Sequence, residues 1–171
     1  MIRRRLLPLA VLLALAPAAA GCGDDNKDST TKAATQATST SASTTTYQTQ
    51  VQTILTSVGT AGSTLGTAAQ ASSSSADIAT ALEKFQASVK QAADELAKLT
   101  APAKAQTGQD ELEQVLRDIA DGVQPSIDAA KANNRTKFTT TFKAYQAKLD
   151  GAYRDRLTAA GAKIDKALAG Q

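Results

Sequence analysis

Cys22 is the only cysteine in this chain, and the sequence contains no histidine. A nucleophilic thiol needs a neighbouring group that stabilises its thiolate, and histidine is the usual one. The missing histidine also excludes Ser-His-Asp catalysis, zinc sites built from cysteine and histidine, and the Glu-x-x-His sites of di-iron helical bundles. The sequence has no P-loop and no G-x-G-x-x-G motif. We therefore predict that the protein is not an enzyme and holds no cofactor.

A row of carboxylates in the middle of the chain is the second group with chemical potential. Its members are Asp110, Glu111, Glu113, Asp118 and Asp121. Oxygen ligands of this kind suit a weak divalent-cation site. Asp110 and Glu111 also suit the first turn of a helix that begins near Thr107, because the helix dipole favours negative charge there. We favour the second interpretation and predict no metal ligand.

The first 21 residues have the pattern of a secretory signal peptide. Three arginines at positions 3–5 precede the charge-free stretch Leu6 to Ala20, which is too short to cross a hydrocarbon core of about 30 Å. The end of this stretch and the two residues after it, Ala19-Ala20-Gly21-Cys22, resemble the lipobox of bacterial lipoproteins. In that family the cysteine thiol receives a diacylglycerol, and signal peptidase II cleaves before the cysteine. The resemblance implies that Cys22 is the lipid attachment site.

Two details of this segment bear on the lipoprotein interpretation. Ala19 stands three positions before the cysteine, where the family usually has a leucine-like residue. Ala18-Ala19-Ala20 also fits the A-x-A site of the ordinary signal peptidase, which would release a soluble protein. Acylation would account for the single cysteine, since one thiol cannot form an internal disulfide. We therefore expect a lipid anchor at the extracytoplasmic face of the cell membrane.

Removal of the leader would change the charge of the chain. The full sequence has 19 Lys/Arg, 16 Asp/Glu and a net charge of +3. Residues 22–171 hold 16 of each, which gives no overall basic footprint for nucleic acid. Residues 22–46 are rich in Ser and Thr and contain no Leu, Ile, Val, Phe or Trp, so we predict a flexible linker there. Residues 47–171 are expected to form one folded domain.

Apolar residues in this domain recur at spacings of three and four, which predicts amphipathic helices. Four helices are expected, over about residues 47–69, 78–99, 102–130 or 107–130, and 138–168. They favour an all-α, up-down antiparallel four-helix bundle. The alternative is a three-helix coiled coil with the first helix loosely attached.

Local signals place the ends of these helices. Thr45 and Gln48 fit a capping box at the start of the first helix, and Ser72–Ser75 predicts a turn that supplies the next N-cap. Pro125 predicts a kink or break in the third helix, and Asn133-Asn134 predicts a turn. The glycines of the first helix weaken it by up to about 1 kcal/mol each relative to alanine, unless they admit a neighbouring helix. These glycines are Gly59, Gly62 and Gly66.

Charge is distributed unevenly over the predicted helices. Residues 135–171 hold eight Lys/Arg and three Asp/Glu, whereas residues 76–132 hold six Lys/Arg and ten Asp/Glu. One interpretation is a basic helix that contacts anionic lipid or polymer. We favour the other interpretation, in which oppositely charged helices lie side by side in one bundle.

These features together predict a non-enzymatic interaction or structural module of the cell envelope. Its expected partners are the membrane, through the N-terminal lipid, and an envelope protein or polymer. The alternative function is a small-ligand or divalent-cation site between helices.

Overall fold

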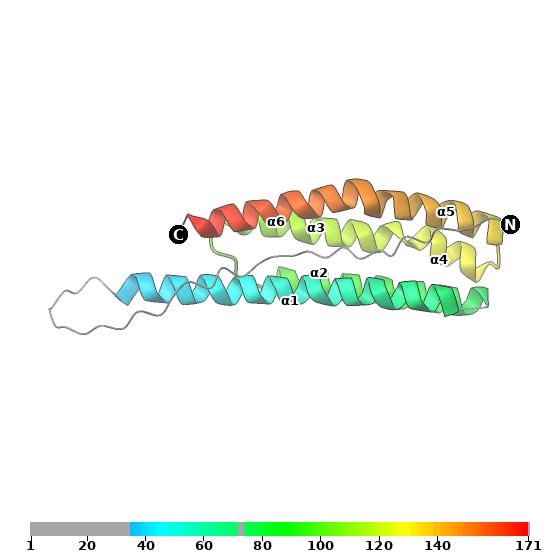
Figure 1. The fold of residues 1–171 in the computed structure, drawn as a ribbon, viewed down its shortest axis with the longest axis horizontal. Coiled ribbons are helices and arrows are strands. Elements are labelled where there is room, and N and C mark those ends of the chain that lie inside the picture. Colours follow the sequence, from blue (N-terminus) through cyan, green and yellow to red (C-terminus); the bar gives the residue numbers. More distant parts are fainter. Residues whose placement is uncertain (1–34, 72–73, 171) are drawn as a thin grey trace. The chain divides into compact units, whose positions relative to one another are not determined.

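The computed structural model describes residues 35–71 and 74–170, and every regular element in these two ranges is a helix (Figure 1). Cys22, the predicted leader and the first part of the predicted linker lie outside the described residues. The prediction of an all-helical domain is confirmed. The elements are α1 (Thr35–Ala71), α2 (Ser75–Ala97), α3 (Gln106–Gly122), α4 (Gln124–Lys131), α5 (Arg135–Lys148), the π-helical turn η1 (Leu149–Tyr153) and α6 (Arg154–Ala169).

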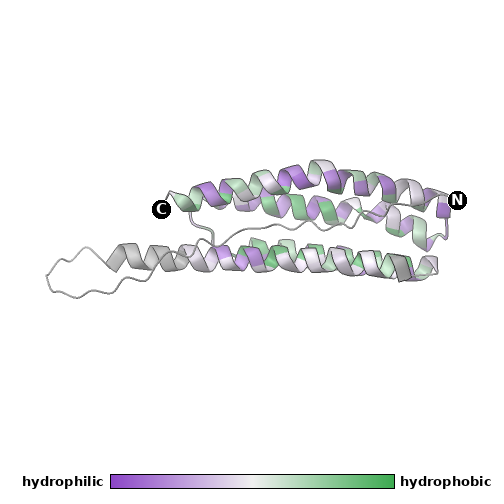
Figure 2. Cartoon of the chain, viewed as in Figure 1, coloured by the Kyte–Doolittle hydropathy of each residue, from purple (hydrophilic) through white to green (hydrophobic). Residues whose placement is uncertain are grey.

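These elements pack as a helical bundle with four helical segments, since α3 continues into α4, and α5 continues through η1 into α6. α2 lies at the centre of the packing and contacts α1, α3 and α4. The last segment covers the third, because α5 packs on α4 and α6 packs on α3. Side chains from all four segments form one hydrophobic cluster. In Figure 2, which colours the residues by hydropathy, many residues along α5 and α6 are hydrophilic.

The first helix is an integral part of this core. Tyr47, Val51, Ile54 and Leu65 of α1 are all buried in the common cluster. The three-helix alternative required α1 to be loosely attached. The burial of four α1 side chains in the common core disfavours that alternative.

The first helix also begins earlier than predicted. α1 starts at Thr35, so Thr45 is not a helix cap, and its carbonyl accepts a hydrogen bond from the Thr49 hydroxyl at 3.0 Å within the helix. Residues 35–46 contain no large apolar side chain, and therefore carry no hydrophobic periodicity that could reveal a helix. Tyr47 is nevertheless the first buried side chain among those described, at the residue where the folded domain was expected to begin.

The other predicted helix ends are confirmed by their capping contacts. The Ser74 hydroxyl accepts a hydrogen bond from the Asp77 amide at 3.1 Å and caps α2. Asn133 has a positive φ of 51°, and the Asn134 side chain accepts from the Lys137 amide at 3.0 Å to cap α5. The break near Pro125 falls between Gly122 and Gln124, where α3 ends and α4 begins.

The π-helical turn η1 lies in the segment that packs against this break. The Tyr145 hydroxyl, just before the turn, donates a hydrogen bond to the Ile119 carbonyl of α3 at 3.1 Å. Tyr153, at the end of the turn, comes so close to Gly122 that a Cβ there would lie 2.7 Å from the Tyr153 hydroxyl. The two irregular points of the bundle are thus packed together through two tyrosines.

Candidate functional site

The predicted row of carboxylates does not converge on a common point. Asp110 accepts a hydrogen bond from the side-chain amide of Gln106 at 2.8 Å. Glu111 forms an ion pair with Lys163 of α6. Asp121 forms an ion pair with Lys90 of α2 at 3.5 Å. Within residues 35–71 and 74–170, no group of three or more Asp, Glu, Cys or His side chains is placed to hold a metal ion.

The helix-dipole interpretation of the same residues does not hold, although α3 begins within one residue of the expected Thr107. α3 begins at Gln106, so its first turn is Gln106–Gln109 and contains no acidic residue. Because the dipole acts mainly within the first turn, it does not explain Asp110 or Glu111. Each acid instead has a side-chain partner, which is Gln106 for Asp110 and Lys163 for Glu111.

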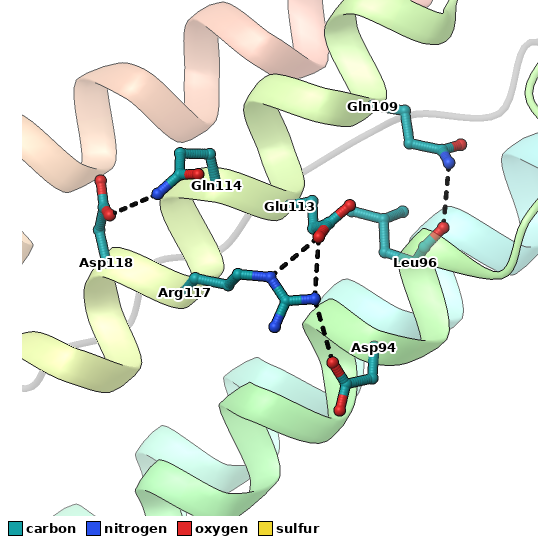
Figure 3. A network of polar contacts seen from close by, with 7 residues as sticks. All are labelled: Asp94, Leu96, Gln109, Glu113, Gln114, Arg117 and Asp118. Carbon is teal, nitrogen blue, oxygen red and sulfur yellow. Dashed lines mark hydrogen bonds and ion pairs between the residues drawn. The ribbon is translucent and has the colours of Figure 1, made fainter.

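Arg117 of α3 contacts Glu113 of its own helix and joins α3 to α2 through Asp94 (Figure 3). Its guanidinium donates to Glu113, one turn earlier, at 2.9 Å and to Asp94 of α2 at 3.1 Å. These hydrogen bonds raise the pKa of Arg117, first through Glu113 and then through Asp94. The three side chains form a polar contact between α2 and α3.

Asp118 joins α3 to the last helix. Its carboxylate accepts from the Arg156 guanidinium of α6 at 2.5 Å and from the Gln114 amide at 2.8 Å. The hydrogen bond from Arg156 lowers the pKa of Asp118 and outweighs the opposing effect of partial burial. Asp118 is therefore a stable anion and not a proton donor at neutral pH. Together with the Glu111–Lys163 pair, it confirms that acidic α3 and basic α6 are complementary.

Helix α5 departs from this complementarity. Its four cationic side chains are exposed, and none of them forms an ion pair with another described residue. These side chains, called the α5 cations below, are Arg135, Lys137, Lys143 and Lys148. In the basic C-terminal region, Arg156 and Lys163 of α6 are therefore paired with α3, whereas the α5 cations face solvent.

Gln109 is a buried polar residue that the sequence analysis did not single out. Its amide nitrogen donates to the carbonyls of Leu96 and Leu99 at 3.0 and 3.1 Å, and so satisfies the end of α2. Its amide oxygen, like the Tyr47 hydroxyl, is buried without a hydrogen-bond partner among the described residues. The available signal was positional, because residue 109 falls on the apolar stripe that runs through Leu112 and Leu116.

Burial of Tyr145 makes stability sensitive to alkaline pH. Desolvation raises the pKa of Tyr145 well above its ordinary value, and Tyr153 adds to the shift. A tyrosine in the unfolded chain has a pKa of about 10, and below that pH the raised pKa in the folded state leaves the free energy of unfolding unchanged. As the pH rises above about 10, the unfolded chain loses its proton first, and the free energy of unfolding falls by up to about 1.4 kcal/mol per pH unit. Urea unfolding at pH 8 and pH 11 should show this loss. Tyr145→Phe should have a smaller loss, at a cost of about 0.5–1.5 kcal/mol at pH 8 for its missing hydrogen bond. An unchanged pH dependence in the variant would contradict the assignment.

The predicted lipid attachment site, Cys22, is not among the residues that the structure describes. In the described ranges, no helix combines the length and apolar character needed to cross a membrane. The chain matches no protein-family model, and neither a curated protein nor a solved structure is significantly similar to it.

Proposed function

We propose that this protein is a non-enzymatic helical module anchored by lipid at the extracytoplasmic face of a bacterial cell membrane. The observation that carries the proposal is the lipobox-like sequence Ala19-Ala20-Gly21-Cys22 behind a basic and apolar leader. In this proposal, residues 1–21 are the signal peptide and Cys22 bears the diacylglycerol. The module acts through its surface, on an envelope protein or polymer.

The proposed architecture is an up-down antiparallel four-helix bundle behind a short polar tether. The packing of successive segments supports it, since α1 lies on α2, α2 on α3 and α4, and the α5–α6 segment on both of the latter. The start of α1 at Thr35 shortens the tether to residues 22–34. A chain of this length reaches at most about 45 Å. The bundle would therefore stay near the bilayer.

The charged side chains of the described residues favour an interaction module over the ligand-binding alternative. A ligand or cation site between helices would need polar groups that converge on one volume. The five acids of α3 instead contact five different sets of partners, on α2, on α6 and within α3 itself. Exposed ion pairs of this kind contribute little to stability individually, and mainly specify which helix faces lie together.

Replacing Cys22 tests the anchor. In cells given a labelled fatty acid, we expect the wild-type protein to be labelled and to sediment with membranes, and Cys22→Ser to be unlabelled, because serine offers no thiol to acylate. The matched variant Ala19→Leu brings the sequence closer to the usual lipobox and should keep its label.

Two results would contradict the lipid anchor. One is a Cys22→Ser variant that remains as strongly labelled and as membrane-bound as the wild type. The other is an intact mass of the wild-type protein that corresponds to an unmodified chain starting at Gly21, which would assign the cleavage to Ala18-Ala19-Ala20 and the ordinary signal peptidase.

A further inference from the structure

Helix α5 carries the largest excess of unneutralised charge in the described part of the chain. Its 14 residues include four cations and no acid. Several cations on neighbouring helices, in contrast, form ion pairs. Arg156 and Lys163 of α6 pair with α3, and Lys131 of α4 pairs with Glu83. The α5 cations have no such partner among the described residues, and all four side chains are exposed.

The elements packed against α5 do not supply the missing negative charge. α4 contains a single acid, Asp128, which accepts a hydrogen bond from the Gln124 amide at 2.8 Å. η1 likewise contains one acid, Asp150. These two carboxylates and the one further cation, Lys131, leave a net charge of +3 over residues 124–153.

Two aromatic rings lie between the α5 cations. Phe138 and Phe142 stack with their centroids 5.4 Å apart and are both partly exposed. Helical spacing of about 100° per residue places Lys137 and Lys148 on one side of this pair and Arg135 and Lys143 on the other. Because Phe138 and Phe142 pack against the hydrophobic core of the bundle, α5 presents its cations, and not an apolar face, to the solvent.

We propose that α5 is a membrane-contact surface that binds the anionic phospholipid headgroups of the bilayer. The cations supply the attraction, which acts within a Debye length of a negatively charged membrane surface. The proposed tether of residues 22–34 would hold this surface within about 45 Å of the bilayer, which favours phospholipid headgroups over a soluble polyanion. The proposal rests on the proposed function in one respect, namely that the lipid on Cys22 brings the bundle to the membrane.

The test uses residues 22–171 with Cys22→Ser in every sample, so that neither leader nor lipid contributes to binding. This chain contains every residue that the structure describes. Flotation is measured with vesicles of phosphatidylcholine alone and with vesicles in which about one third of the lipid is phosphatidylglycerol. We expect binding only to the anionic vesicles, and release as the salt concentration is raised.

A matched pair of triple variants locates the binding surface. Lys137, Lys143 and Lys148 are changed to Gln in one variant, and Lys84, Lys98 and Lys166 in the other. The second set is also exposed and without an ion pair among the described residues, but it lies on α2, after α2 and on α6. We expect the α5 variant to lose on the order of tenfold to hundredfold in affinity for anionic vesicles, and the control less than about threefold. Equal thermal unfolding of the two variants will show that both are folded.

Three results would overturn the proposal. The first is equal weakening by both triple variants, which would mean that total charge and not α5 drives binding. The second is absence of binding to anionic vesicles. The third is binding to a soluble glycerol-phosphate polymer without binding to vesicles, which would assign α5 to a polymer. Because Cys22 is absent from every sample, failure here leaves the anchor intact, and failure of the acylation test leaves this result intact.

Discussion

Leu116→Ala is expected to lower the free energy of unfolding by about 2–5 kcal/mol. Leu116 is fully buried, in the middle of α3, and α3 packs on both α2 and α6. Removing its side chain leaves a cavity in the hydrophobic cluster, and the surrounding side chains can fill such a cavity only in part. Urea unfolding followed by circular dichroism measures the change.

Leu157→Ala is the matched control for this core prediction. Leu157 belongs to α6 and packs at the edge of the same hydrophobic cluster, but it is partly exposed. Its truncation should cost about 1 kcal/mol, since water already reaches part of the side chain. Equal costs for the two leucines would contradict the placement of Leu116 inside the core and of Leu157 at its edge.

Gly108→Ala is expected to destabilise the protein by about 1–3 kcal/mol, through overpacking against α6. A Cβ at this position would lie 2.8 Å from Cγ1 of Ile164, and 3.1 Å from both the Ala160 carbonyl oxygen and the Ile164 amide nitrogen. Two of these atoms belong to the backbone of α6 and cannot move aside without shifting that helix. Alanine has a helix propensity about 1 kcal/mol better than that of glycine, and the expected steric cost exceeds this gain.

Gly62→Ala provides the opposite result with the same chemical change. A Cβ on Gly62 of α1 would meet no atom within 4 Å, apart from its own local helix backbone. The substitution should therefore gain up to about 1 kcal/mol from helix propensity alone. The two variants are compared by thermal and urea unfolding. If Gly108→Ala also stabilises the protein, the close contact between α3 and α6 is wrong.

The glycines also show that the sequence alone could not predict which glycine allows close contact between helices. The three glycines of α1 were the candidates for close helix approach, yet all three open into free space. The glycine that does allow close approach, Gly108, entered the sequence analysis only within a helix whose start was left open. Periodicity along one helix cannot distinguish these cases, because the deciding atoms belong to another helix.

The charged residues show the same division. Both interpretations of the carboxylate row failed, since they considered α3 in isolation. The partners of Glu111 and Asp118 lie 52 and 38 residues further along the chain. The helix faces that meet in the folded bundle decide that Arg156 and Lys163 of α6 are paired with α3 and that the α5 cations are not paired.

The sequence by itself determined the helical class, the capped turns at Ser74 and Asn134, and the break before Pro125, because the interactions responsible lie within a few residues of one another. It also predicted the lipid anchor at Cys22 from a short contiguous motif. Only the tertiary structure decided the hydrogen-bond partners of Gln109, the close contact at Gly108 and the separation of paired from unpaired cations. Each of these depends on atoms brought together by packing between distant segments, and a local pattern contains no record of them.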